Sequence, residues 1–186
     1  MRIIAGIAKS RPILSPKGMG TRPTQDYIRE ALFNIIIKHV PDAVCLDLFG
    51  GSGALGLEAI SRGAEHCVFC DKSYDAINTI KNNIKNLKFE EQSTLIKGDW
   101  EACLNKIADK NIKFDLVFLD PPYDFKKYSN IFETFNKLNL INDDALVVLE
   151  QEKSLDVAEY DGFSHIDSRD YGITRIHFYK RRPVNE

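Results

Sequence analysis

Short apolar segments alternate with longer amphipathic segments through the middle of the chain, and this alternation limits the possible folds more than any other feature. The apolar segments predict strands at 43–48, 65–70, 93–97 and 114–119. The segments that follow them predict helices at 53–62, 74–87, 100–109 and 128–138. Repeated strand–helix units build a mostly parallel sheet with helices on its faces, so we expect an α/β fold.

Both ends of the chain depart from this alternation. Three further strands are predicted near 145–150, 162–168 and 173–180. Only the turn around Arg169–Gly172 separates the last two, so we expect a hairpin that places one antiparallel strand in a seven-stranded sheet. Before the alternation, Arg2–Ile7 and Arg11–Leu14 predict a small β-hairpin, and a helix is predicted near 25–38.

The four residues Asp120, Pro121, Pro122 and Tyr123 follow directly on the strand predicted at 114–119. Two consecutive prolines cannot continue the hydrogen-bond ladder, so they make a rigid turn at the edge where open α/β sheets bind ligands. The Asp120 carboxylate and the Pro121 carbonyl could accept both hydrogens of an exocyclic base amine, and Tyr123 could stack on the base. We therefore predict that these four residues catalyse methyl transfer to such an amine; an ordinary turn that ends a strand is the alternative.

A glycine-rich turn follows the strand at 43–48, within the segment Asp47–Gly53. Gly51 and Gly53 would let the backbone approach a ligand closely, and the N-terminus of the next helix would face that ligand. The spacing matches neither the dinucleotide fingerprint nor the phosphate-binding loop. The Asp47 carboxylate would repel a pyrophosphate and attract a cationic ligand with a free amine, such as S-adenosylmethionine. A plain turn remains the alternative.

Acidic residues also end the second and third strands of the alternation, at Asp71 and Asp99. Asp71 could accept hydrogen bonds from both ribose hydroxyls of a nucleoside ligand. Asp99 could accept one from the adenine amine, with Trp100 or Ala102 near the ring. Each acid could instead cap the helix that follows it. Together with Asp47, however, three acids at three consecutive strand ends favour a shared ligand site.

These motifs resemble the S-adenosylmethionine-dependent amino-methyltransferases. The matching residues are Asp47–Gly53, Asp71, Asp99 and Asp120–Tyr123. The ends of the chain are similar to the RsmD family of 16S ribosomal RNA guanine-N2 methyltransferases, in Arg2–Gly6 with Lys9–Arg11, in Arg22–Asn34 and in Tyr171–Arg175. The resemblance covers nearly the whole chain. It implies a Rossmann-like class I methyltransferase that methylates N2 of the guanine conventionally numbered 966 in the small-subunit RNA.

The resemblance also implies two cofactor contacts that the residues alone do not suggest, Thr24 and Phe49. This chain departs from the family pattern at the ribose-binding acid, which is often glutamate in the family and is Asp71 here. The aspartate side chain is shorter by one methylene and has the same carboxylate chemistry. The implied reaction is an in-line displacement in which the protein mainly positions the reactants. Neither a metal ion nor a general base with a tuned pKa is required, because the amine can lose its proton after the transfer.

The net charge of −2 conceals a basic first segment. The first 25 residues contain no acid and five basic residues: Arg2, Lys9, Arg11, Lys17 and Arg22. Prolines and glycines punctuate this segment, so we expect a basic hairpin arm at 1–20 and a methyltransferase domain at 21–186. The five basic residues are predicted RNA contacts, because a basic arm suits a phosphate backbone, and Lys180–Arg182 could add to them. A solvated, partly disordered terminus is the alternative.

The rest of the sequence fits a cytoplasmic protein of 186 residues, with neither a signal peptide nor a membrane-length apolar run. Cys45, Cys67 and Cys70 lie in predicted strands, as buried, reduced thiols do. Cys67 and Cys70 have the spacing of zinc and redox sites. Residues three apart in a strand point to opposite faces, however, and no second pair completes a tetrahedral set, so no metal is expected.

Two other functions use the same features. A DNA adenine-N6 or cytosine-N4 methyltransferase would carry the same motifs, but it usually needs a target-recognition region for which this chain has little spare length. A non-catalytic RNA-binding assembly factor could keep the fold, but it has no need of the acceptor pair at Asp120 and Pro121. We therefore expect a monomeric enzyme that acts on 16S rRNA in an assembled or partly assembled small ribosomal subunit, where bound proteins could fix the target loop.

Overall fold

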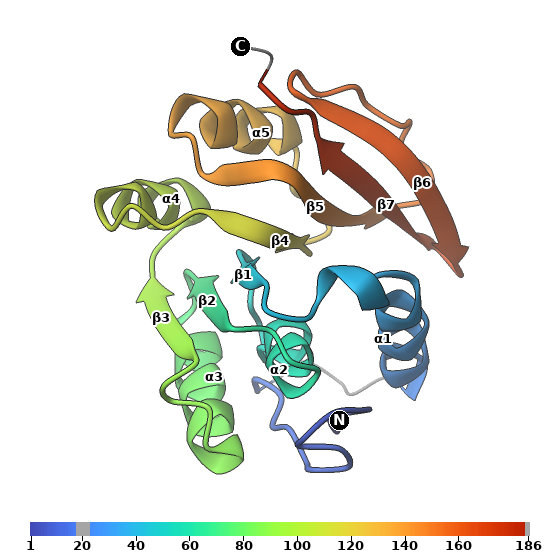
Figure 1. Cartoon of the computed structure of the whole chain (residues 1–186). Helices are drawn as coiled ribbons and strands as arrows, with labels where there is room; N and C mark the ends of the chain where they lie inside the picture. Colours follow the sequence, from blue (N-terminus) through green and yellow to red (C-terminus); the bar gives the residue numbers. More distant parts are fainter. Residues whose placement is uncertain (18–22, 185–186) are drawn as a thin grey trace.

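One mixed sheet organises the chain, with seven strands in the order β3-β2-β1-β4-β5-β7-β6 (Figure 1). The computed structural model describes residues 1–17 and 23–184. The strands are β1 (Val44–Asp47), β2 (His66–Asp71), β3 (Ser93–Lys97), β4 (Phe114–Leu119), β5 (Ile141–Glu152), β6 (Phe163–Tyr171) and β7 (Thr174–Arg181). Pairing is parallel from β3 through β5, and β7 is antiparallel to both β5 and β6. The predicted mostly parallel sheet with one antiparallel strand is confirmed.

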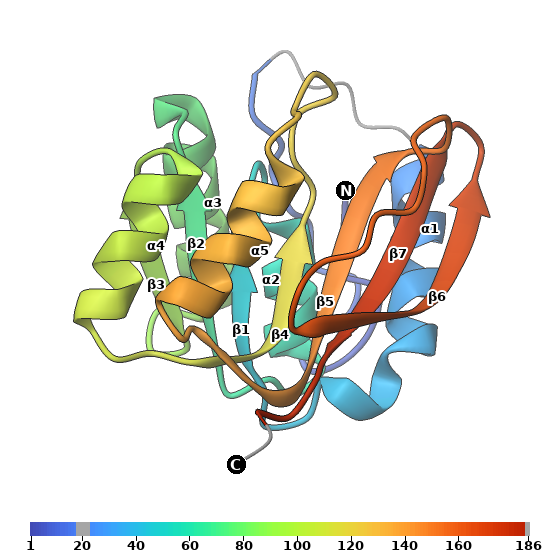
Figure 2. The ribbon, with the colours of Figure 1, turned by 90° about the horizontal axis from the view of Figure 1, so that it is seen from above.

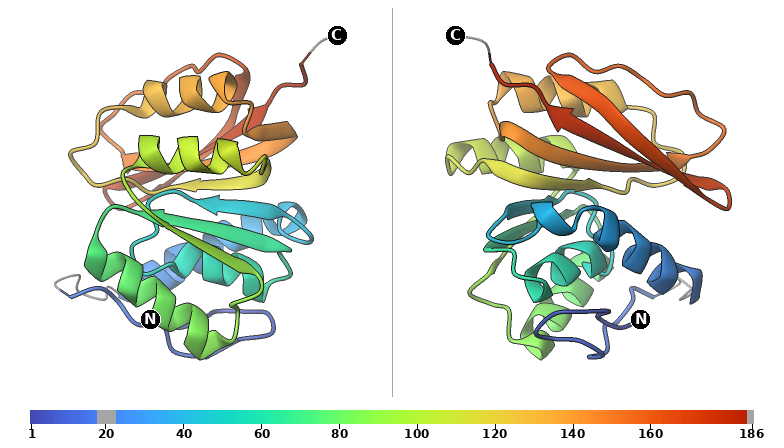
Figure 3. Two further views of the ribbon diagram at one scale, coloured as in Figure 1. Left: turned by 90° about the vertical axis from the view of Figure 1, so that its left-hand side faces the viewer. Right: turned by 45° about the vertical axis from the view of Figure 1, so that its right-hand side comes forward.

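Helices cover both faces of the sheet (Figure 3). The helices are α1 (Pro23–Ile35), α2 (Ala54–Ser61), α3 (Tyr74–Leu87), α4 (Trp100–Asp109) and α5 (Tyr128–Lys137). The first three contribute to one buried cluster, and α4 and α5 contribute to the other. The first helix is shorter than the predicted 25–38, because the chain tightens into a 3-10 turn at Ile37–His39 just before Pro41.

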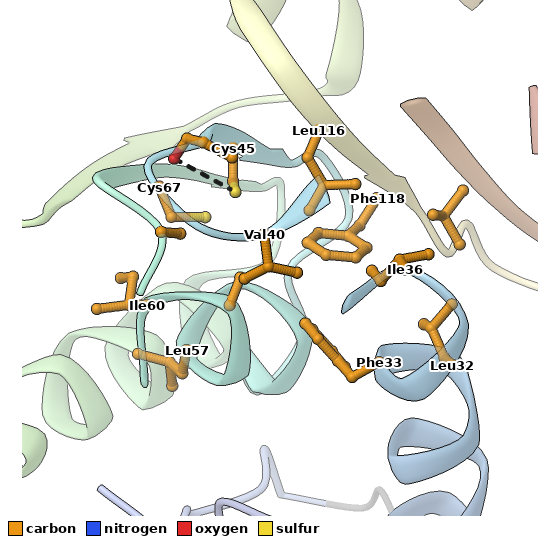
Figure 4. Close-up of a cluster of buried hydrophobic side chains, with 14 of the residues drawn as sticks. Leu32, Phe33, Ile36, Val40, Cys45, Leu57, Ile60, Cys67, Leu116 and Phe118 are labelled. Carbon is orange, nitrogen blue, oxygen red and sulfur yellow. Dashed lines mark hydrogen bonds between the residues drawn. The ribbon is translucent and has the colours of Figure 1, made fainter. Parts of the chain in front are cut away.

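The central strands β1, β2 and β4 are apolar at most positions because both of their faces are buried. Side chains alternate between the two faces along each strand. Cys45 and Cys67 belong to the cluster under α1 and α2, which Figure 4 shows, whereas Cys70 and Cys103 belong to the cluster under α4 and α5. The prediction that Cys67 and Cys70 point to opposite faces is confirmed, and all four cysteines are free and buried.

Strand β5 is longer than the predicted 145–150, and the polar residues before Ala145 explain the difference. Ile141 already pairs with Phe114, and the register then shifts before Leu146 pairs with Leu116. Asp144 adopts a left-handed backbone conformation with φ 63°. The polar residues before Ala145 resemble a turn because a register shift interrupts the strand at this point. The parts of β5 before and after the shift both pair with β4.

Residues 1–17, called here the N-terminal segment, do not form the predicted two-stranded hairpin. A single antiparallel bridge joins Arg2 and Pro12. Ile3, Ala8 and Ile13 are buried in the core cluster that α1 and α2 cover. The two halves of the segment still exchange some backbone hydrogen bonds, but the backbone nitrogens of Ile4, Ala5, Ile7 and Ala8 donate to Glu58 and Ser61 of α2, so no continuous ladder forms among the described residues.

Glu58 on α2 anchors this segment. Its carboxylate is 0% exposed and accepts hydrogen bonds from the backbone of Ile4 at 2.9 Å and of Ala5 at 3.0 Å. It also forms ion pairs with Arg29 at 3.4 Å and Arg62 at 2.8 Å. The buried charge is therefore fully partnered, which is the condition under which a carboxylate can be retained in a core.

The predicted boundary between 1–20 and 21–186 falls at Gly20, outside the described residues. The division into two domains stays a prediction, although the N-terminal segment shares a core with the rest of the chain.

Gly6, with φ 84°, lies so close to α2 that a Cβ atom there would come within 1.8 Å of the Ser61 carbonyl oxygen. None of the helices among the described residues has the length and apolar character needed to span a membrane.

Candidate active site at the carboxyl edge of the sheet

The carboxyl ends of the parallel strands bring the predicted site residues to one edge of the sheet. Asp47 ends β1 and Asp71 ends β2. Asp99 follows β3 by one short turn, and Asp120 follows β4 directly. Figure 2 shows the loop after β4 projecting from this edge. Because these strands run in parallel, four acids that are far apart in the sequence lie along one edge.

The glycine turn between β1 and α2 is fixed by the end of β2. The Gly50 nitrogen donates to the Cys70 carbonyl oxygen at 2.8 Å, and the Gly51 nitrogen donates to Oδ2 of Asp71 at 2.9 Å. Gly51 and Gly53 have φ values of 58° and 78°, which favour glycine. A Cβ atom on Gly51 would meet no described atom within 4 Å. The turn is thus rigid on its inner side and open on its outer side, as a ligand cradle requires.

Asp71 holds two parts of this edge together. Besides Gly51, its carboxylate accepts a hydrogen bond from the Ser73 nitrogen at 2.8 Å through Oδ1. Ser73 itself caps α3 by accepting from the Ala76 nitrogen at 3.3 Å, so Asp71 does not take the cap position. Each carboxylate oxygen has a second lone pair, which leaves Asp71 able to accept from ribose hydroxyls as predicted.

Asp99 caps the next helix, α4, by accepting a hydrogen bond from the Ala102 nitrogen at 2.8 Å. The capping alternative for this residue is therefore confirmed. Its side chain is exposed, and the cap occupies Oδ1 only, so Oδ2 can still accept from a ligand amine. Trp100 is half-buried and packs against the cluster under α4 and α5. The adenine contacts of Asp99 and Trp100 stay predictions.

Asp47 ends β1 directly before the glycine turn, as the sequence predicts, but its side chain is buried. It is 1% exposed and accepts a hydrogen bond from the Gly56 nitrogen of α2 at 3.2 Å. Burial raises its pKa to about 8 against the opposing hydrogen bond from Gly56, and the charges of Asp120 and Asp71 add to the rise. Asp47 therefore supports the glycine turn from behind, and its predicted contact with the cofactor stays a prediction.

Asn83 on α3 is a site residue that the sequence reasoning missed. It is 1% exposed, and its Nδ2 donates to the carbonyl oxygens of Ser52 at 2.8 Å and Leu14 at 2.9 Å. Its Oδ1 accepts from the Leu14 nitrogen at 2.8 Å. Asn83 thus ties the glycine turn to the N-terminal segment. The available signal was an amide on the apolar face of an amphipathic helix, between Ile80 and Ile84.

The loop after β4 packs against the glycine turn through aromatic rings. Phe49 and Phe125 meet edge to face with their centroids 5.3 Å apart. The Phe125 nitrogen donates to the Pro122 carbonyl oxygen at 2.9 Å, which closes the loop. Tyr123 at the tip is 69% exposed, so its ring is free to stack on a ligand. Phe49 supports the site from within, and the side chain of Thr24 lies outside the described residues.

Part of the Asp120 side chain is exposed to solvent, but the protein atoms around its carboxylate limit the hydration of the charge. This desolvation raises its pKa to about 6. Glu150 on β5, which no motif indicated, is its neighbour, because Leu119 and Leu149 are paired partners of β4 and β5. Burial raises the pKa of Glu150 to about 8, and the charge of Asp120 adds to the rise.

The predicted RNA contacts of the N-terminal segment divide into two groups. The prediction that Arg11 contacts RNA is corrected by the structure. Its side chain is half-buried and donates to the carbonyl oxygens of Leu87, at 3.2 Å, and of Asn86, so it stabilises the C-terminal end of α3. The remaining described contacts are exposed: Arg2, Lys9 and Lys17. Arg22 lies outside the described residues.

Arg2 and Lys9 line an open cavity of about 380 Å³ between the N-terminal segment and α1. Tyr27 and two acids, Asp26 and Glu30, line it as well, so the cavity is not uniformly basic. A second open cavity, of about 490 Å³, lies on the outer side of α3 and β3. Neither cavity includes the glycine turn or the loop after β4, so the site is identified by its chemistry and not by its depth.

The C-terminal basic run lies at the opposite edge of the sheet. Lys180 pairs in register with Leu146, near the start of β5, whereas the candidate site lies at the strand's other end. Lys180 also forms an ion pair with Asp144 at 2.9 Å, and Arg182 forms one with Asp161 at 3.7 Å. This run is therefore distant from the site and partly neutralised, which argues against an RNA contact that serves catalysis.

Known proteins resemble this chain over nearly its whole length. The family model described as Conserved hypothetical protein 95 matches residues 1–180. "Putative rRNA methyltransferase YlbH" of Bacillus subtilis (strain 168) is 36% identical over 183 residues, which cover 98% of this chain and 100% of the relative. "Ribosomal RNA small subunit methyltransferase D" of Haemophilus influenzae is 31% identical over 182 residues, which cover 97% of this chain and 93% of the relative.

A solved structure is similar to this chain in both fold and sequence. "Putative methyltransferase yhhF from Escherichia coli" superposes with a TM-score of 0.87 at 30% identity, and the match covers 98% of each chain. The similarity therefore includes the N-terminal segment and the hairpin of β6 and β7 in addition to the central sheet.

Proposed function

The chain belongs to the RsmD family of methyltransferases, and from this premise we propose that it transfers a methyl group from S-adenosylmethionine to the exocyclic N2 amine of one guanine in small-subunit ribosomal RNA. The observation that carries the proposal is the meeting of two motifs at one sheet edge. The glycine turn fixed by Asp71 faces the loop Asp120–Tyr123, and Phe49 and Phe125 hold the two together.

The residues present fit the cofactor. The open side of Gly51 provides a surface for close backbone approach, and Asp71 and Asp99 retain lone pairs for ribose hydroxyls and for the adenine amine. Asn83 and Asp47 would keep the turn in place from behind. When bound, the cofactor supplies a methyl group on a positively charged sulfur, which the amine nitrogen can attack directly.

The residues after β4 would position that amine. Asp120, ionised above a pKa of about 6, accepts one N2 hydrogen, and the Pro121 carbonyl accepts the other. The ring of Tyr123 stacks on the extruded base. The lone pair of N2 is then held toward the cofactor side of the edge. The proton that N2 releases after methylation can pass to Asp120, which lies next to it.

Replacing Asp71 by alanine is expected to weaken S-adenosylmethionine binding by about 1–3 kcal/mol, because the ribose hydroxyls lose a charged acceptor and the Gly51 nitrogen loses its partner. Isothermal titration calorimetry measures this change. The matched control is Asp75→Ala, which removes an exposed acid in the first turn of α3. A loss of thermal stability with unchanged cofactor affinity would show that Asp71 is only structural.

RNA contact by the exposed part of the N-terminal segment is a separate proposal. Replacing Lys9 and Lys17 by glutamine should flatten the dependence of log K on log salt by about 0.7–0.9 for each lost phosphate contact. Point changes are preferable to deleting 1–20, because Ile3, Ala8 and Ile13 belong to the core. Lys180→Gln at the opposite edge is the control. An unchanged slope of log K against log salt in the double variant would mean that the N-terminal segment stabilises the fold but does not contact RNA through these lysines.

We also propose that the substrate is an assembled or partly assembled small subunit and that the enzyme acts as a monomer. Few groups at the site edge are free to read a base sequence, so recognition would depend on the shape of the RNA around the target. Bound ribosomal proteins would raise the fraction of molecules in which that shape is formed.

Two other functions are separated from this one by a single experiment. A DNA adenine-N6 or cytosine-N4 methyltransferase would use the same acceptor pair, and a non-catalytic assembly factor would bind RNA without transferring a methyl group. The experiment offers labelled S-adenosylmethionine with small-subunit particles, DNA or protein in parallel. Label in the ribosomal RNA alone supports the proposal. Label in DNA, or none in any of them, would contradict it.

A further inference from the structure

We propose that Glu150 contacts the target base beside Asp120 and makes the site selective for guanine. The inference rests on the proposed function and extends it to a residue that neither the motifs nor the resemblance indicated. Glu150 lies in β5 directly after the apolar run Ala145–Leu149, and its side chain is half-buried. It forms no hydrogen bond or ion pair with any group that the structure describes, so its carboxyl group is available to a ligand.

The register of the sheet places Glu150 next to Asp120. Leu119 of β4 pairs with Leu149 of β5 in a parallel ladder, so Asp120, the first residue after β4, lies beside Glu150, the next residue of β5. The charge of Asp120 adds to the raised pKa of Glu150, which shows that the two carboxyl groups are close to each other. Asp120 lies two residues after Phe118, and Glu150 lies two residues after Val148. Phe118 and Val148 both belong to the cluster under α1 and α2, so the alternation of side chains directs both acids to that face.

The strand order places Glu150 on the substrate side of the edge. β1, which carries the glycine turn, lies on one side of β4, and β5 lies on the other. Asp120 therefore lies between the residues that would hold the cofactor and Glu150. A base whose amine is held at Asp120 and faces the cofactor would extend the rest of its hydrogen-bonding edge toward β5.

The two acids share their protons unequally. Limited hydration raises the pKa of Asp120 to about 6, and burial raises that of Glu150 to about 8. The charge of Asp120 adds to the rise at Glu150, which favours a pair with one proton. The charge of Asp120 also adds to the raised pKa values of Asp47, from β1, and of Tyr128, from α5, so these are the other titratable groups near it. At neutral pH the pair thus presents an acceptor at Asp120 and a hydrogen-bond donor at Glu150.

A donor beside an acceptor matches the base-pairing edge of guanine. Guanine offers the O6 acceptor on one side and the N1 and N2 hydrogens on the other, so protonated Glu150 would donate to O6 while Asp120 accepts from the amine. In 2,6-diaminopurine the 2-amine is retained, but an amino group replaces O6 and N1 carries no hydrogen. At position 6 that base presents an amino donor where guanine presents the O6 acceptor, so the Glu150 donor would face another donor. Unmatched polar groups of this kind discriminate strongly between substrates.

The test uses small-subunit particles reconstituted with 16S RNA that carries either guanine or 2,6-diaminopurine at the methylated position. Glu150→Ala should lower kcat/KM on guanine by about tenfold to a hundredfold and reduce the preference for guanine over diaminopurine. Glu150→Gln, which keeps a donor at the same position, should stay within a few-fold of the unaltered enzyme on guanine. Asp143→Ala, an exposed acid near the other end of β5, is the control.

Melting temperature and calorimetric affinity for S-adenosylmethionine should change little in any of these variants, because Glu150 holds no described group in place. Unchanged kcat/KM and base preference in Glu150→Ala would overturn the inference, as would equal losses in the alanine and glutamine variants. In those cases methylation of guanine by the unaltered enzyme would leave the proposed function standing. If the unaltered enzyme does not methylate guanine in these particles, both are wrong.

Discussion

Replacing Asp120 by alanine should nearly abolish methyl transfer while S-adenosylmethionine still binds. Asp120 contributes no hydrogen bond to the described structure, so its removal should leave the fold and the cofactor cradle unchanged. It removes the acceptor that orients the amine at the moment of transfer. Loss of one such preorganised group costs about a hundredfold to a thousandfold in rate.

Single-turnover rates on small-subunit particles measure this loss, and calorimetry measures cofactor affinity. Asp124→Ala is the matched control, because it removes an exposed acid from the same loop, beyond the tip at Tyr123. Asp120→Asn keeps one acceptor oxygen and should fall between the alanine variant and the unaltered enzyme. A near-normal rate for Asp120→Ala would remove this residue from the mechanism. A rate that falls only together with cofactor affinity would assign it to the cradle.

Replacing Glu58 by alanine should destabilise the protein by about 3–5 kcal/mol, which is the cost of breaking a buried ion pair from one side. Arg29 and Arg62 would lose their shared partner, and the backbone nitrogens of Ile4 and Ala5 would lose their acceptor. Urea unfolding measures the free-energy change, and amide hydrogen exchange at Ile4 and Ala5 reports local release of the N-terminal segment.

Release of the N-terminal segment should also destabilise the glycine turn that would hold the cofactor. Asn83 bonds both Leu14 and Ser52, so an undocked segment leaves one side of the amide unpaired and loosens the glycine turn. We therefore expect Glu58→Ala to weaken S-adenosylmethionine binding at temperatures where the rest of the fold persists. Glu65→Ala, an exposed acid just after α2, should change neither quantity. Normal exchange protection at Ile4 in Glu58→Ala would refute the anchoring role.

The sequence predicts the central sheet well because its signals are local. The apolar run that became β4 is bounded by a proline turn, and the run that became β1 is bounded by glycines, so each boundary has its own residue chemistry. Parallel strands then bring their carboxyl ends to one edge without further information. The sequence alone therefore assigns Asp71, Asp99 and Asp120 to one edge of the sheet.

Residues whose role depends on a distant partner could not be assigned in this way. The N-terminal segment looks like an independent hairpin, because nothing local shows that Glu58 on α2 is its hydrogen-bond acceptor. Arg11 counts as a free charge in the sequence and is bound to the end of α3 in the structure. Asp47 looks like a ligand contact because it precedes the glycines, yet it faces Gly56.

Glu150 was missed for a further reason. It follows five apolar residues of β5, with no proline, glycine or aromatic beside it to mark a motif. Only the pairing of Leu119 with Leu149 places it beside Asp120. Neighbours across a sheet are set by register, which the local sequence does not encode.

The most direct test of the account is to identify the methylated nucleoside. Small-subunit particles and protein-free 16S RNA from cells lacking this enzyme are incubated with the purified protein and labelled S-adenosylmethionine, and the RNA is digested to nucleosides. The account predicts that the label appears as N2-methylguanosine from a single position, and faster in the particles than in the bare RNA. Label in an adenine or cytosine derivative, or no label in small-subunit RNA, would contradict it.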